Sequence, residues 1–169
     1  MYENALNLIK SLQEEIDELP GVKIYKKNNI EYDQYSLAIT DQGLKKATEK
    51  LFRDGHHARA IEEAYKYIDN LVKKTAKPMD PKLSGSSLMQ KVFSENDPIL
   101  KLNAGTTQSE CDEQKGYMQI FAGCMTGIRN PRAHECDWED SEEHAFQLLT
   151  FACHLVDKIC SSEKASNKP

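Results

Sequence analysis

The stretch YMQIFAGCMTGI at residues 117–128 decides the fold class, because its apolar side chains repeat with the period of an α-helix. The residues at positions i, i+3, i+4, i+7, i+8 and i+11 share one face: Tyr117, Ile120, Phe121, Cys124, Met125 and Ile128. Upstream, Ser109 with Asp112 three residues later resembles a capping box with Asp in place of the usual Glu. This pair predicts where the helix begins.

Three more amphipathic helices are expected around this one. Asp41 can cap the first, Gly55 separates it from the second, and Asp140 with Glu143 opens the last. Their apolar stripes are Leu44, Ala47 and Leu51; Ala58, Ile61, Ala64, Ile68, Leu71 and Val72; and Ala145, Leu148, Leu149, Ala152, Leu155, Val156 and Ile159. A shorter helix is possible at residues 88–93. Four long helices without strand alternation predict an all-α fold, an antiparallel four-helix bundle.

The ends of the chain are expected to lie outside this bundle. An apolar repeat predicts an N-terminal helix from Glu3 to Leu19, which stops at a Pro-Gly pair. Residues 22–38 keep no sustained period, so a short strand pair and a loop both remain possible. We therefore expect an N-terminal extension over residues 1–39, the helical bundle over 40–161 and a frayed tail over 162–169.

Composition limits the functions that the chain can have. A net charge of -5 argues against tight, sequence-independent binding of nucleic acid, although a few local arginines can still bind RNA. The sequence has no run of about 20 apolar residues, so no membrane span is expected. Five cysteines, an odd number without CxxC pairs, indicate reduced thiols and a cytoplasmic location.

The segment from Arg129 to His134 is the best candidate for chemistry. Because a proline disfavours helical angles in the residue before it, Pro131 predicts that the long helix ends just after Arg129. A guanidinium at a helix end and an imidazole a few residues later could then meet at one phosphate. The spacing alone is equally consistent with arginines that stabilise the helix C-terminus.

No cofactor or metal is expected. P-loop and dinucleotide fingerprints are absent from the sequence. A structural zinc is the alternative, but its possible ligands lack paired spacing such as CxxC or HExxH: His134, Cys136, His144, Cys153 and His154.

The run GIRNPRAHE at residues 127–135 resembles the signature of the Ymh family, a bacterial and phage group placed in the HEPN superfamily. LFRDGHH at residues 51–57, AIEEA at 60–64 and DEQKGYM at 112–118 carry the same resemblance. It extends from about Leu44 to Ile159.

The resemblance implies a fold, a reaction and partners. HEPN domains are helical bundles with an Arg-x4–6-His motif at the end of the third core helix, and Arg129, Asn130 and His134 match it. Many members are metal-independent endoribonucleases that act as homodimers, as toxins or in antiphage defence, some restrained by an antitoxin or another regulatory partner. Others are non-catalytic dimeric modules that bind nucleotide or a partner protein, and this alternative stays open.

If the chain is a ribonuclease of this kind, as the resemblance implies, each motif residue has an expected role. His134 would be the base that deprotonates a ribose 2'-OH or the acid at the leaving oxygen, and Arg129 would stabilise the phosphoryl charge. Asn130 would orient either group. Arg132 is a second phosphate contact or a solvent-facing charge at the helix end, and Glu63 either faces the motif or lies exposed.

Overall fold

The computed structural model describes residues 33–77, 80 and 82–164. The chain divides into two compact units, residues 1–33 and 34–169, and the description below concerns the second. The helix expected from Glu3 to Leu19 lies outside the described residues. No described helix is long and apolar enough to span a membrane.

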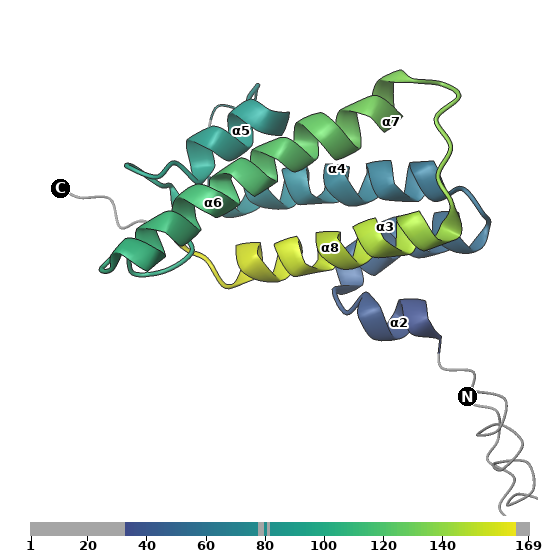
Figure 1. Cartoon of the computed structure of the whole chain (residues 1–169), viewed down its shortest axis with the longest axis horizontal. Helices are drawn as coiled ribbons and strands as arrows, with labels where there is room; N and C mark the ends of the chain where they lie inside the picture. Colours follow the sequence, from purple (N-terminus) through teal and green to yellow (C-terminus); the bar gives the residue numbers. More distant parts are fainter. Residues whose placement is uncertain (1–32, 78–79, 81, 165–169) are drawn as a thin grey trace, which may run out of the picture. The chain divides into compact units, whose positions relative to one another are not determined.

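The described part is helical, which confirms the all-α fold class (Figure 1). The short helix α5 overlaps the one considered possible at residues 88–93, and the short helix α2 adds to those that were expected. The elements are α2 (Gln34–Ala38), α3 (Gln42–Arg53), α4 (His57–Thr75), α5 (Gly85–Val92), β1 (Leu100–Lys101), α6 (Gln108–Cys124), the π-helical turn η1 (Met125–Arg129), α7 (Asn130–His134), α8 (Glu142–Cys160) and β2 (Glu163–Lys164).

Helix α4 is the centre of the packing, since it contacts α3, α5, α7, η1 and α8. Its side chains Ile61, Tyr65, Ile68 and Val72 are fully buried. The Tyr65 hydroxyl donates to the carbonyl of Leu148 in α8 at 3.2 Å, and burial raises the pKa of this phenol. Each large apolar side chain buried in this way contributes about 1.5–3 kcal/mol to stability.

Helix α2 belongs to the same unit, although it precedes the boundary expected near Thr40. Its Tyr35 is buried, stacks on Phe52 of α3 at 5.0 Å and makes a 2.6 Å hydrogen bond with the Thr48 hydroxyl. The unit therefore begins at Gln34, because aromatic burial against α3 fixes these residues to the bundle.

Side-chain caps determine where α3, α6 and α8 begin. Oδ1 of Asp41 accepts from the Leu44 amide at 2.7 Å, as predicted. Helix α6 begins with a complete capping box of Thr107 and Glu110, two residues before the predicted pair. Helix α8 is capped by Ser141 instead of Asp140, whose carboxylate is engaged elsewhere.

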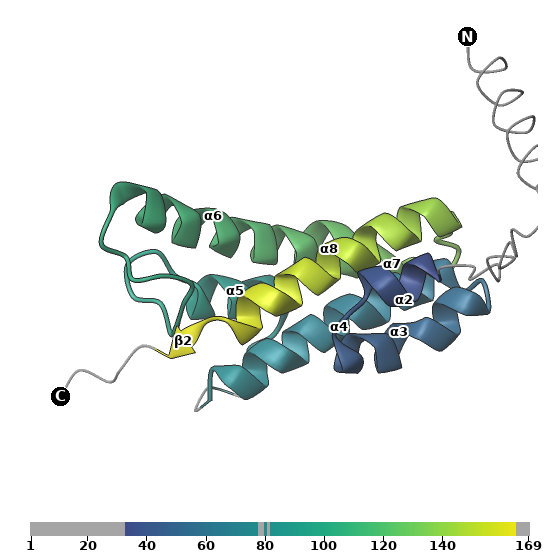
Figure 2. The ribbon, with the colours of Figure 1, turned by 90° about the horizontal axis from the view of Figure 1, so that it is seen from below.

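The predicted end of the long helix at Arg129 is wrong. Figures 1 and 2 show α6 continuing into α7, and the helix ends only at Glu135, whose backbone is extended. In a regular helix the ring of Pro131 would clash with the carbonyl four residues before it. Here the amide of Asn130 donates five residues back, to Met125, in a π-helical turn that is one residue wider and admits the proline.

The segment after α8 pairs with an earlier loop. Leu100 lies opposite Lys164, and Lys101 lies opposite Glu163, in an antiparallel ladder of β1 and β2. Strand β2 follows α8 in Figure 2. The predicted fraying from residue 162 is therefore wrong at residues 163–164, because β1 supplies backbone partners. Residues 165–169 lie outside the described part.

Candidate functional site

Arg132 is buried in a two-pronged ion pair. Its Nε and Nη2 donate to the two carboxylate oxygens of Asp140 at 2.7 and 2.6 Å, and its Nη1 donates to the carbonyl of Ile128 at 2.7 Å. The side chains of the pair are only 3% and 2% exposed. The expectation that Arg132 contacts phosphate or faces solvent is corrected: the guanidinium ties α7 to the segment before α8.

Trp138 lies on the other side of this guanidinium. The Cζ of Arg132 is 5.4 Å from the centre of the indole, a cation–π contact. The Trp138 residue is nevertheless 42% exposed. The ion pair thus supports one face of an aromatic ring that solvent still reaches.

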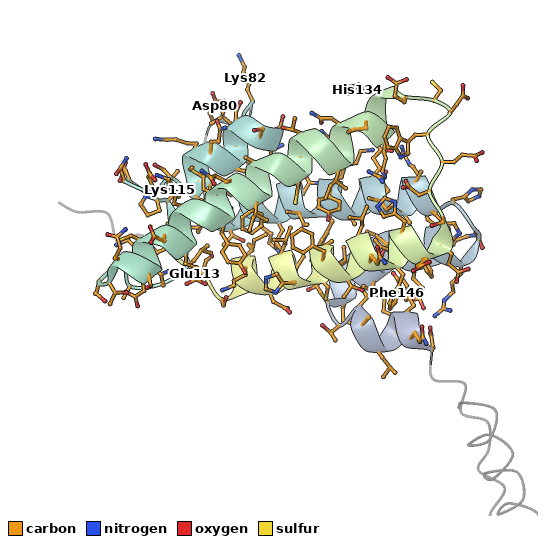
Figure 3. The ribbon with its side chains drawn as sticks, viewed as in Figure 1. Asp80, Lys82, Glu113, Lys115, His134 and Phe146 are labelled. Atoms are coloured by element: carbon orange, nitrogen blue, oxygen red, sulfur yellow. The ribbon has the colours of Figure 1, made fainter. Side chains whose placement is uncertain are left out.

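His134 is the last residue of α7 and is exposed (Figure 3). It lines a pocket of about 290 Å³ together with Arg59 and Glu62 of α4 and with Trp138. Arg129 and Asn130 are not among the residues that line this pocket. The structure therefore brings His134 together with α4, and the rest of the motif lies on the preceding turn.

Arg129 carries an unsatisfied polar atom. Its Nε is buried and has no hydrogen-bond partner among the described residues, while its Nη1 lies 3.4 Å from the amide oxygen of Asn130. A buried donor without an acceptor destabilises a protein by about 1–3 kcal/mol. Such an atom is a candidate for an anionic ligand to satisfy.

Glu62, not Glu63, faces the motif. The Glu62 side chain is 6% exposed and lines the His134 pocket, whereas the Glu63 side chain is 29% exposed and does not. Glu62 accepts from Arg59 at 2.6 Å and pairs with Lys66 at 2.7 Å. Burial acts to raise the pKa of Glu62, but Lys66 and Arg59 lower it by more, so the carboxyl stays ionised at neutral pH.

The sequence carries a signal for the burial of Glu62. Glu62, Tyr65, Asp69 and Val72 recur at helical spacing and are all buried on one stripe of α4. An acid in register with an apolar stripe points inward. Glu63 is one residue, or about 100°, off that stripe.

A second pocket, of about 560 Å³, adjoins the first. It lies between the start of α4, residues 55–59, and the loop of residues 136–140. Both pockets are lined by Ala58, Arg59, Cys136 and Trp138, so they are neighbours, and the two together are here called the Trp138 groove. His57 lines its wider half, and the Nδ1 of this residue is buried without a hydrogen-bond partner in the described part.

The groove has an acidic rim. The exposed acids that line it are Glu135, Asp137 and Glu139. Against them stand His134 and Arg59, whose side chain is 55% exposed although it pairs with Glu62 and Glu63.

The described residues contain no group of three or more His, Cys, Asp or Glu side chains that could hold a metal ion. Three of the five candidates named for zinc make other contacts. Cys153 is buried near the Thr40 hydroxyl, His154 bonds the Tyr117 hydroxyl at 2.7 Å, and His144 pairs with Asp140 at 2.9 Å.

These features define an all-helical protein with a polar groove at one end of its long helix. The chain belongs to the Hypoth_Ymh family, described as proteins of unknown function, whose model matches residues 38–159. The resemblance to the Ymh family is thereby confirmed, and the match includes the whole Trp138 groove. No curated protein and no solved structure matches the chain.

Proposed function

We propose that this protein is a metal-independent endoribonuclease of the HEPN type, with α3, α4, α6–α7 and α8 as the four-helix bundle. The observation that carries the proposal is His134, exposed in a groove beside Arg59 and one helical turn after an unsatisfied guanidinium nitrogen of Arg129. A histidine buried in the core would instead have favoured a non-catalytic module.

The reaction is a transesterification that needs a base, an acid and a cation at the phosphate. His134 takes the proton of a ribose 2'-OH, and the 2'-oxygen attacks the adjacent phosphorus. The bond from phosphorus to the 5'-oxygen breaks, and this oxygen receives a proton from an acid. The products are a 2',3'-cyclic phosphate end and a 5'-hydroxyl end. Arg129 stabilises the negative charge that builds up on the phosphoryl oxygens, and Asn130 holds its guanidinium.

The π-helical turn supports this assignment. Such turns are rare and occur frequently at functional sites. Here the turn ends at Arg129, inside the motif, and allows the helix to carry Arg129 and His134 without a break. Arg59 replaces Arg132 as the second arginine for a phosphate, since the Arg59 side chain is 55% exposed although it pairs with Glu62 and Glu63, whereas the Arg132 side chain is 3% exposed.

A homodimer would supply both base and acid, because each chain contributes one His134. Ile120 lies exposed on α6, the helix that leads into the motif. Three glycines of this long helix have open space where a Cβ atom would lie: Gly116 and Gly123 in α6 and Gly127 in η1. A second copy could approach this backbone closely. In the cell such an enzyme would be cytoplasmic, a toxin or antiphage effector restrained by an antitoxin or other regulatory partner.

The second candidate is a non-catalytic dimeric module that binds nucleotide or a partner protein. The acidic rim favours it, because exposed carboxylates repel an RNA backbone.

RNA digestion in excess EDTA separates the two candidates. We expect wild-type protein to cut RNA, and the variants Arg129→Ala and His134→Ala to lose about 100-fold or more in rate. His154→Ala is the matched control, an exposed histidine outside the groove, and should cut normally. Intact RNA with wild-type protein, or undiminished cutting by both motif variants, would refute the enzyme.

A further inference from the structure

Trp138 stands out among the exposed side chains. The large hydrophobic residues exposed in the described part are Leu37, Ile120 and Trp138, and of these only Trp138 is aromatic. It lines both halves of the groove that holds His134. An exposed indole that lines a groove has the position of a ligand-binding residue.

The indole is held in place from one side. Arg132 lies under the ring at 5.4 Å and is itself fixed by three hydrogen bonds, to Asp140 and Ile128. No aromatic ring of the described residues stacks on the ring of Trp138. A rigid ring with solvent access is preorganised to stack a planar ligand, since little conformational entropy is lost on binding.

The space beside the ring suits one nucleotide. The wider half of the groove, about 560 Å³, lies within the range of small-molecule sites. Its walls include Asp137, Glu139 and His57. Carboxylates repel phosphate but accept hydrogen bonds from base amino groups, and one carboxylate can accept both the N1–H and the amino N–H of guanine. The phosphate then belongs in the other half, with Arg59 and His134.

We propose that the wider half of the Trp138 groove is a nucleobase site, in which Trp138 stacks the base and the acidic rim selects bases that carry an amino group, guanine above all. The inference rests on the proposed function in that the base belongs to the nucleotide next to the bond that His134 cleaves. It gives the acidic rim a role in recognition of the substrate.

Intrinsic fluorescence tests the site directly, because the chain has one tryptophan. Full-length protein is titrated with GMP, UMP and ribose 5-phosphate. We expect GMP to quench the emission saturably, UMP to bind more weakly, and ribose 5-phosphate, which lacks a base, to leave the emission unchanged. No quenching by GMP, or equal quenching by ribose 5-phosphate, would overturn the proposal.

Two variants sharpen this test through calorimetry with GMP. Trp138→Ala should weaken binding about 5- to 150-fold, the range for loss of one stacked base, whereas Trp138→Phe should retain most of it. Thermal unfolding followed by circular dichroism verifies that both variants are folded. Equal affinity of wild type and a folded Trp138→Ala would contradict the stacking role.

The outcomes separate this site from the ribonuclease. Quenching by GMP in a protein that leaves RNA intact supports the nucleobase site and refutes the enzyme. Cutting of RNA without quenching by GMP refutes the site and leaves the enzyme standing.

Discussion

The helical segment from Gln108 to His134 differs between its two ends. At the first turn side chains make hydrogen bonds to the backbone, whereas at the last turns polar side-chain groups are unpartnered or exposed to solvent. Thr107 and Glu110 exchange hydrogen bonds in a capping box, and Gln114 binds the loop before it through three further bonds. At the other end, the Nε of Arg129 has no partner among the described residues and His134 is exposed.

The difference separates structural from functional requirements. The first end has the side-chain capping that is usual at a helix N-terminus. The second end has a π-helical turn, a buried Nε of Arg129 without a hydrogen-bond partner, and the exposed ring of Trp138 close by. Such departures are expected at functional sites, where stability is lost locally and compensated elsewhere. The buried pair of Arg132 and Asp140 lies at the same end of the helix.

The largest expected effect comes from breaking that pair. Asp140→Ala leaves the buried Arg132 guanidinium without a counter-charge and should lower the free energy of unfolding by about 3–5 kcal/mol, measured by denaturant titration. Asp137→Ala, an exposed acid of the same loop, is the control and should change it by no more than about 0.5 kcal/mol. Equal effects of the two variants would show that the pair does not stabilise the functional end.

Glu62→Gln comes second. It removes a buried carboxylate from Arg59 and Lys66 and should destabilise the protein by about 1–3 kcal/mol at neutral pH, measured by denaturant titration. Glu63→Gln is the control, with an effect of about 0–1 kcal/mol, because its partly exposed ion pairs are screened by water.

The pH dependence of the Glu62→Gln effect has a definite sign. The pKa of Glu62 in the folded protein lies below its ordinary value of 4.5, so the carboxylate stabilises the fold above that value. This contribution is lost as the pH falls through the folded-state pKa. The stabilities of wild type and Glu62→Gln should therefore converge in acid; a gap that stays constant down to the acid transition contradicts this role of Glu62.

A smaller effect is expected at the first end of the helix. Thr107→Ala removes the capping box and should reduce stability by about 1 kcal/mol, seen as a lower Tm. RNA cleavage at a temperature where the variant is folded should be unchanged, since this end serves the fold alone. A parallel loss of activity would mean that the two ends are not separable in this way.

The smallest effect on stability should come from Gly123→Arg. A side chain at this position meets open space in one chain, so the unfolding free energy should change by no more than about 1 kcal/mol. In a dimer that packs α6 against its copy the arginine would collide. Light scattering should then show a monomer and cleavage should fall; a dimer with full activity would place the interface elsewhere.

Local patterns predicted much of the fold. The Asp41 cap and the Gly55 break depend on residues within a few positions of one another and were predicted correctly. The stripe of α4 was predicted in part, since Ile61, Ala64, Ile68 and Val72 are buried but the equally buried Tyr65 was not predicted. The start of α6 was displaced because Thr107 with Glu110 and Ser109 with Asp112 overlap. The longer Glu side chain reaches the cap backbone, and this decides between the two.

The site depended on contacts that no local rule contains. The motif residues Arg129 and His134 were recognisable, but the π-turn that admits Pro131 depends on the carbonyl of Met125. The ion pair of Arg132 with Asp140, eight residues further along the chain, depends on the path of the intervening loop. Trp138 was not selected from the sequence, because a single aromatic residue in a loop carries no period.

The end groups of the RNA fragments test the central claim most directly. Wild-type protein is incubated with a defined RNA in excess EDTA, and the fragments are analysed by mass spectrometry beside those from His134→Ala and His154→Ala. The account predicts 2',3'-cyclic phosphate and 5'-hydroxyl ends with wild type and His154→Ala, and uncut RNA with His134→Ala. Fragments with 5'-phosphate ends, or the same fragments with His134→Ala, would contradict it.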